Sequence, residues 1–244
     1  MTAIDIRHLC KQYKDVTAVD DLCLTIEDGE LFALLGVNGA GKTTTVKMLS
    51  TLVRPTSGDA LVCGHSILDK GDAIKEIVDI SMQETAVARK LTVEENIEFY
   101  ASLSGQSKEE IEQCKARLYQ TFGLDKVKTK RAQKLSGGWQ RKLSISLALA
   151  SQPRVLFLDE PTLGLDVLAR RELWQTIRSL KGQMTIILTT HYMEEAEALA
   201  DRIGIMKDGR LLFVGTKEAL YARTGKQSVE EAFIEIVAGG DDNA

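Results

Sequence analysis

The glycine-rich segment at residues 36–44, GVNGAGKTT, constrains this chain of 244 residues more than any other feature. It fits the pattern G-x-x-x-x-G-K-[ST], with an apolar run at 31–35 before it and apolar residues at helical spacing over 43–52. Strand, glycine loop and helix together predict a phosphate-binding loop, because the glycines let successive N–H groups point at phosphate oxygens. The N-terminus of the following helix adds a partial positive charge. We expect Lys42 to contact the outer phosphates of a nucleotide and the Thr43 hydroxyl to hold Mg²⁺.

An acidic pair follows the apolar stretch at residues 155–158. Buried carboxylates at the end of a strand need a cation, and Mg²⁺ suits them beside a phosphate loop. We expect Asp159 to hold Mg²⁺ through water and Glu160 to polarise the attacking water. The competing interpretation is an ordinary salt-bridged acidic pair.

Two further polar residues end predicted strands. Gln83 follows the apolar segment 77–81, and His191 follows the buried strand at 185–190. In open α/β sheets, ligand contacts lie at the carboxyl ends of the strands. His191 is therefore a candidate donor to the γ-phosphate and Gln83 a candidate ligand contact. Each residue also has an alternative interpretation without a functional role: His191 as a structural histidine and Gln83 as an ordinary loop amide.

A second cluster of free backbone N–H groups is predicted at residues 135–138, Leu-Ser-Gly-Gly, where a helix running to about residue 150 begins. The first turn of a helix has unpaired N–H groups, so Ser136, Gly137 and Gly138 form a second candidate anion site. One nucleotide needs only one such site.

Composition narrows the class of protein. The net charge of −4 argues against a broad nucleic-acid surface, and no nucleic-acid partner is expected. No run approaches the ~18 apolar residues of a membrane helix, and no signal peptide is visible at the N-terminus. The four cysteines contain no C-x-x-C pair and the three histidines show no metal-ligand spacing, so we expect reduced thiols in a cytosolic protein.

The order of the segments predicts an α/β fold. Two alternating β segments, at 4–9 and 19–26, precede the loop, and short strands follow at 60–63 and 77–81. Helices at about 92–103 and 107–122, with capping boxes at their starts, predict a helical subdomain inserted over about 84–152. A hairpin at 203–214 with an Asp-Gly turn and two short helices end the chain. We expect one domain over 1–225, and a short helix with a flexible tail over 226–244.

These motifs, in this order, resemble the nucleotide-binding domain of ABC transporters over nearly the whole chain. Residues 36–44 resemble the Walker A loop of that family, 155–160 the Walker B strand and 135–138 the signature motif. Residues 163–166 resemble the D-loop, His191 the switch histidine and Gln83 the Q-loop. The resemblance implies a P-loop NTPase of the ABC type: a mixed RecA-like sheet with an N-terminal antiparallel β subdomain and an inserted helical subdomain.

The resemblance assigns a role to each site residue. Catalysis would involve Glu160, His191, Gln83 and Lys42, and Mg²⁺ would be held by Thr43, Gln83 and Asp159. Tyr13 would stack on adenine, although a lone aromatic residue is more often part of a core. The implied contacts of ATP are Tyr13, Val19, Gly36, Asn38, Gly39, Ala40, Gly41, Lys42, Thr43, Thr44, Ser136, Gly137, Gly138 and Asp166.

The resemblance also implies partners. Two copies would form a head-to-tail homodimer around two Mg-ATP, each ATP lying between the Walker loop of one copy and Ser136–Gly138 of the other. ATP would then drive a separate membrane permease, contacted through the helical subdomain, with the chain peripheral on the cytoplasmic face of the membrane. Segments at 54–58, 91–96, 209–216 and 229–234 look like bacterial drug-resistance-type exporters. One departure is Trp139, where the family usually has Gln.

Three other functions remain open at this point. An importer ATPase fits the same motifs, and the C-terminal pattern favours export only mildly. A soluble ABC ATPase acting on ribosomes or DNA usually has two ATPase domains, long coiled-coil insertions or basic stretches. A nucleotide-binding regulator that does not hydrolyse ATP is disfavoured by the intact Lys42, Asp159, Glu160 and His191.

Overall fold

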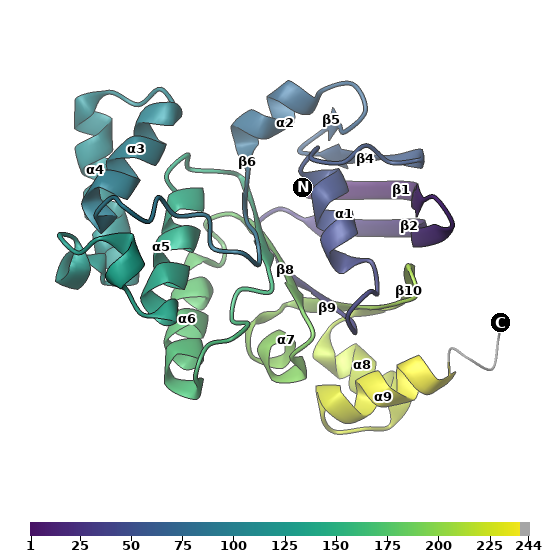
Figure 1. Ribbon diagram of the computed structural model, residues 1–244. Helices are drawn as coiled ribbons and strands as arrows, with labels where there is room; N and C mark the ends of the chain where they lie inside the picture. Colours follow the sequence, from purple (N-terminus) through teal and green to yellow (C-terminus); the bar gives the residue numbers. More distant parts are fainter. Residues whose placement is uncertain (240–244) are drawn as a thin grey trace.

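The computed structural model describes residues 1–239 and has two β-sheets with helices on both sides of the larger one (Figure 1). The expected flexible tail falls largely on residues 240–244, which lie outside the described residues. The α/β class, the antiparallel N-terminal sheet and the inserted helices predicted from the sequence are all confirmed.

The smaller sheet is antiparallel and contains the N-terminus, with strand order β2-β1-β4-β5. Its strands are β1 (Thr2–Tyr13), β2 (Val16–Glu27), β4 (Ser57–Val62) and β5 (His65–Ser66). The β1–β2 pairing shifts register between Ile6 and Leu9. Such β-bulges let the strand keep its apolar side chains on the core face despite an extra residue.

The larger sheet has strand order β10-β9-β3-β8-β7-β6, and all neighbours are parallel except the β9–β10 hairpin. The strands are β3 (Leu31–Leu35), β6 (Val78–Ser81), β7 (Val155–Asp159), β8 (Thr185–Thr190), β9 (Arg202–Lys207) and β10 (Arg210–Gly215). Strand β3 is fully buried, as its apolar run predicted, because parallel strands are covered on both faces.

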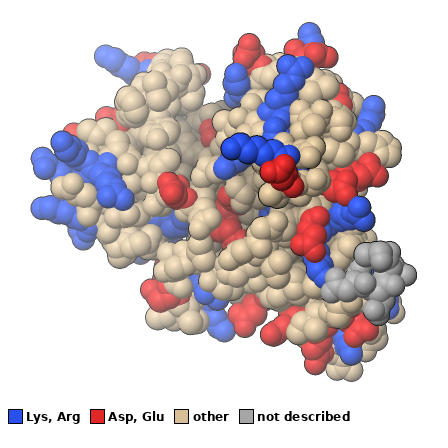
Figure 2. All heavy atoms as spheres, turned by 45° about the vertical axis from the view of Figure 1, so that its right-hand side comes forward, with Lys and Arg blue, Asp and Glu red and all other residues tan. Residues whose placement is uncertain are grey.

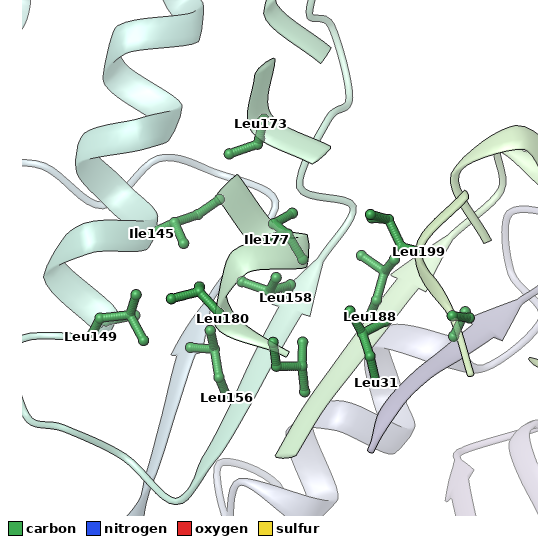
Figure 3. Packing of buried hydrophobic residues seen from close by; sticks show 14 of the residues in the cluster. Leu31, Ile145, Leu149, Leu156, Leu158, Leu173, Ile177, Leu180, Leu188 and Leu199 are labelled. Atoms are coloured by element: carbon green, nitrogen blue, oxygen red, sulfur yellow. The ribbon is translucent and has the colours of Figure 1, made fainter. Parts of the chain in front are cut away.

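Alternate residues of β3 enter two different cores. Leu31, Ala33 and Leu35 belong to the core on the helical side, where leucines of β7 and β8 meet apolar side chains of α5 and α6 (Figure 3). Phe32 and Leu34 point the other way, toward the antiparallel sheet and α1. The period of two along a strand produces this division.

Nine α-helices are present in residues 1–239: α1 (Lys42–Leu49), α2 (Gly71–Ile77), α3 (Val93–Leu103), α4 (Lys108–Phe122), α5 (Gly137–Ala148), α6 (Val167–Leu180), α7 (Met193–Leu199), α8 (Lys217–Thr224) and α9 (Val229–Gly239). Two 3₁₀ turns, η1 (Leu124–Val127) and η2 (Ala132–Lys134), lead into α5.

The inserted helices begin where the sequence predicted. Thr92 and Ser107 both form capping boxes, with Glu95 and Glu110 three residues on. Gly123 ends α4 in the left-handed conformation, with φ 66°. These local signals fix helix ends because each satisfies backbone groups that the helix leaves unpaired.

Two segments differ from the expectation. Helix α2 was not predicted, and Ile77, expected to begin a strand, is its last residue, so β6 begins at Val78. The helix has only seven residues, too few for a helical period to be seen.

The expected C-terminal helix is α9. It packs on α7 and α8, and its residues Val229, Phe233 and Ile236 are buried.

Candidate active site

Four parallel strands bring the predicted chemistry to one edge of the larger sheet. The glycine loop follows β3, the acidic pair lies at the end of β7, His191 follows β8, and Gln83 lies just beyond β6. Since these strands are parallel neighbours, their carboxyl ends lie together.

The glycine loop leads directly into α1, which begins at Lys42. Gly41 has φ 104°, and a Cβ on it would lie 2.3 Å from the Ala18 carbonyl oxygen, so only glycine fits. The Lys42 ammonium donates to the carbonyl oxygens of Gly36 (2.7 Å) and Val37 (3.1 Å). It also lies 3.5 Å from Glu160 Oε1. Burial lowers the pKa of Lys42, while the charge of Glu160 acts in the opposite direction.

Asp159 and Thr43 meet between β7 and α1. The Thr43 hydroxyl lies 3.0 and 3.1 Å from the two carboxylate oxygens of Asp159. Asp159 is only 1% exposed, and the Thr189 hydroxyl also donates to it. A buried carboxylate beside a hydroxyl, at the mouth of a phosphate loop, is a donor set that fits Mg²⁺.

Glu160 is held in an unusual backbone conformation. Its φ of 48° is in the left-handed region, which costs a non-glycine residue about 1 kcal/mol or more. Its amide donates to the carbonyl oxygen of Thr189 at 3.1 Å, which ties this turn to β8. The Glu160 carboxylate is then 2.8 Å from His191 Nδ1. A carboxylate only accepts, so Nδ1 carries the proton and donates.

These groups surround a cleft of about 550 Å³ at the loop. Most of the predicted site residues line it: Tyr13, Asn38, Gly39, Ala40, Gly41, Lys42, Thr43, Thr44, Gln83, Glu160 and His191. Tyr13 is 43% exposed at its rim, a position that suits stacking on a flat base better than a place in the core.

Some predicted residues lie elsewhere. Val19 is fully buried in the core next to the antiparallel sheet, and Ala18 lines the cleft in its place. Alternation along β2 turns adjacent side chains to opposite faces. Gly36 and Asp159 do not line the cleft either. The carbonyl oxygen of Gly36 accepts a hydrogen bond from Lys42, and the carboxylate of Asp159 accepts one from the Thr43 hydroxyl.

The signature residues Ser136, Gly137 and Gly138 do not line this cleft. Ser136 is exposed and precedes α5 without a side-chain cap, so no side chain of its own N-cap satisfies the N–H groups of the first turn. Asp166 caps α6 through the amides of Leu168 and Ala169. Trp139 is half-buried, and the Lys142 ammonium lies 4.9 Å from its ring centre.

Arg141 was not predicted to matter, yet it joins three parts of the site. Its guanidinium donates to the carbonyl oxygens of Pro161 (2.7 Å), Asp159 (2.9 Å), Met82 (2.5 Å) and Gln83 (3.2 Å). Burial lowers its pKa to about 10. Arg141 thus links α5 to the acidic pair and to the segment that contains Gln83. No local signal marks it, because its partners lie far away in the sequence.

A phosphate loop after a central strand, with an acidic pair on a parallel strand of the same sheet, separated from it by one strand, defines a P-loop nucleoside triphosphatase. The family model "ABC transporter" matches residues 19–163, more than half of the chain. The chain therefore belongs to the ABC transporter family as its ATP-binding, ATPase domain, and the resemblance noted in the sequence is confirmed.

Curated relatives fall into two groups. The chain is 38% identical to the daunorubicin/doxorubicin resistance ATP-binding protein DrrA of Streptomyces peucetius, over 91% of this chain and 68% of that protein. It is 41% identical to the human phospholipid-transporting ATPase ABCA3, over 92% of this chain but only 13% of that protein. The chain thus spans about an eighth of this human relative.

Solved structures agree with the fold. An ATP-binding subunit of an ABC transporter superposes with a TM-score of 0.86 at 28% identity, covering 97% of this chain and all of that one. The protein cbiO1 of Clostridium perfringens, described as part of the ABC transporter complex cbiONQ, gives 0.83 at 27% identity over 91% of each chain.

Proposed function

We propose that this chain hydrolyses ATP to ADP and phosphate in the cleft beside the glycine loop. The observation that carries the proposal is the convergence of Lys42, Glu160 and His191 at the carboxyl edge of the sheet. The loop amides and Lys42 would bind the phosphates, and Tyr13 would hold the base.

Glu160 is the residue we assign to the attacking water. Its carboxylate accepts a hydrogen bond from water and orients the water oxygen toward the γ-phosphorus. A P–O bond then forms while the bond to the ADP oxygen breaks, and the water proton leaves with phosphate or Glu160. His191 fixes the carboxylate through Nδ1. In the imidazolium form Nε2 also carries a proton and would donate to the phosphate oxygens.

Mg²⁺ would be held by the Thr43 hydroxyl and Asp159, with Gln83 as a third contact. When bound, this ion neutralises charge on the phosphate oxygens. Within the chain, Asp159 is kept in place by the hydroxyl groups of Thr43 and Thr189.

We further propose that two copies close head to tail around two ATP molecules. The exposed N–H groups at Ser136–Gly138 lie outside the cleft, which supports their use by the nucleotide of a second copy. ATP would stabilise such a dimer because its γ-phosphate contacts both copies.

The partner we propose is a separate membrane permease, and the direction of transport is export. Among residues 1–239, no helix combines the length and apolar character that crossing a membrane requires.

The similarity to daunorubicin resistance and multidrug ATP-binding proteins supports export as the direction of transport. We expect a peripheral position on the cytoplasmic face of the membrane, with the helical subdomain against the permease. Import is the alternative, supported only by the shared ATPase motifs.

The test of hydrolysis is Glu160→Gln, which keeps the shape of the side chain and removes its basicity. We expect ATP turnover to be abolished while ATP still binds, as measured by phosphate release and by nucleotide titration. Glu194→Gln, an acidic residue of α7 outside the cleft, serves as the control. Unchanged turnover in Glu160→Gln would remove Glu160 from its assigned role.

A further inference from the structure

A concentration of positive charge lies on the helical subdomain of a chain whose net charge is −4. Basic side chains gather at the left of Figure 2, on the side where Figure 1 places this subdomain. Here the basic patch means Arg89, Lys90, Lys126, Lys128, Lys130 and Arg131, all of them exposed. The segment 126–131 contains four cations and no acid.

The two halves of the basic patch lie side by side although they are far apart in the sequence. The Gln133 amide donates to the Arg89 carbonyl oxygen at 3.0 Å, and the Val93 amide donates to that of Lys130 at 3.0 Å. Thr92 and Arg131 form an antiparallel bridge between the two segments. The fold therefore holds the two cationic segments next to each other.

These cations form no close ion pair within the chain, although the charges of Glu94 and Glu95 interact with those of Lys128 and Arg131. Within residues 1–239, none of the six side chains has a carboxylate partner within 4.0 Å or donates a hydrogen bond to another residue. The nearest acids are already engaged. Glu94 pairs with Lys115 at 2.9 Å, and Glu95 accepts from the Thr92 amide at 2.7 Å. Glu95 and Asp125 are themselves exposed, so the six cations outnumber the exposed carboxylates beside them.

We propose that the basic patch binds a membrane surface that carries anionic phospholipid headgroups. Clusters of four or more Lys and Arg bind such surfaces through charge alone. This inference rests on the proposed function, which places the chain beside a membrane permease. The patch would then orient the ATPase relative to the bilayer, and it lies outside the nucleotide cleft.

The composition of the patch favours a lipid surface over other anionic partners. Four of its six cations are lysines, whereas cores of protein interfaces are depleted in lysine and enriched in aromatic anchors. No aromatic residue occurs in segments 84–91 or 124–135, so single-stranded nucleic acid would find no base-stacking platform. The patch lies on turns and extended segments rather than on a helix that could enter a DNA groove.

The experiment is co-sedimentation of the full chain, without nucleotide, with vesicles of phosphatidylcholine alone or mixed with phosphatidylglycerol. We expect binding only to the vesicles that contain phosphatidylglycerol, and release at high salt, where the Debye length falls to about 3 Å. Equal binding to both kinds of vesicle, binding that resists salt, or tighter binding to a DNA duplex would each overturn the proposal.

Two triple variants sharpen this test. Lys126→Gln/Lys128→Gln/Lys130→Gln removes three charges of the patch, and we expect binding about a hundredfold weaker, at about fivefold per cation. Lys70→Gln/Lys75→Gln/Lys226→Gln removes the same charge elsewhere and should weaken binding less than about threefold. Equal losses in both variants would mean that only net charge matters and would reject the patch.

The outcome is separable from that of the proposed function. Both triple variants should keep the ATPase rate of the wild type, because none of the six lysines lines the cleft. Absent vesicle binding with intact ATPase rejects only the patch. Vesicle binding with absent ATPase activity rejects only the proposed hydrolysis.

Discussion

Glu160 and His191 form the contact on which the proposed chemistry depends, at 2.8 Å. Both residues follow buried strands directly, so their position could be predicted from the sequence by the apolar runs before them. Lys42, Thr43 and the loop glycines were predictable for a similar reason, because they are contiguous. The burial of Val19 agrees with the alternation along its strand, whereas its contact with ATP was expected only from the family resemblance. The role of Arg141 could not be predicted, since it depends on contacts between segments distant in the chain.

Replacing the switch histidine tests that contact. We expect His191→Ala to lower kcat by about a hundredfold, because a preorganised donor at the reacting phosphate contributes on that scale. ATP affinity should change little, since the loop remains intact. The control is His65→Ala in β5, outside the cleft. A kcat within about twofold of wild type in His191→Ala would contradict the assignment.

Substitutions at Trp139 and Ser136 test which residues of the signature segment are needed for ATP turnover and dimerisation. The proposed phosphate contacts come from Ser136 and backbone amides, so Trp139→Gln should change turnover only modestly. Ser136→Arg should block ATP-driven dimerisation, because it places a long side chain across the exposed N–H groups. Steady-state ATPase rates and molar mass with ATP distinguish the two variants. Equal loss in both would show that this division of roles is wrong.

At the scale of elements, the ends of α3 and α4 were predicted well because capping boxes are local signals. Helix α2 was missed because seven residues show no period. Strand order in the larger sheet was not predicted, since no single segment encodes its neighbours.

The bulge in β1 predicts that alanine substitutions at two glycines of the antiparallel sheet, Gly58 and Gly64, lower the stability by different amounts. Both have positive φ, 76° at Gly58 and 83° at Gly64. A Cβ at Gly58 would lie 2.0 Å from the His8 carbonyl oxygen, while nothing lies within 4 Å at Gly64. We expect Gly64→Ala to lower the free energy of unfolding by about 1 kcal/mol. Gly58→Ala should cost about 2–3 kcal/mol more, and equal losses in urea denaturation would contradict this account.

Arg141 connects three elements, and its removal should affect stability and turnover together. Arg141→Met leaves the buried carbonyl oxygens of Asp159 and Pro161 and two part-buried ones without their donor. We expect a loss of about 3 kcal/mol in the free energy of unfolding. Lys142→Met removes an ion pair with Glu172, which is 63% exposed, and should cost less than about 1 kcal/mol. Denaturant titration of the two variants tests the difference, and similar losses would mean that the Arg141 contacts contribute little.

At the scale of the whole molecule, the chain has one nucleotide cleft and a separate set of exposed N–H groups at Ser136–Gly138. In the proposed head-to-tail dimer, each copy would supply one half of each nucleotide site. The two candidate anion-binding helix starts were visible in the sequence. The basic patch was not, because its two segments meet only in the folded chain.

The most direct test of the central claim is the molar mass of Glu160→Gln by light scattering, with and without Mg-ATP. We expect a monomer without nucleotide and a dimer with Mg-ATP, and we expect Ser136→Arg introduced into the same variant to remain monomeric. A variant that binds Mg-ATP fully yet stays monomeric, while the wild-type monomer hydrolyses ATP at undiminished rate, would contradict the claim that each site is shared between two copies.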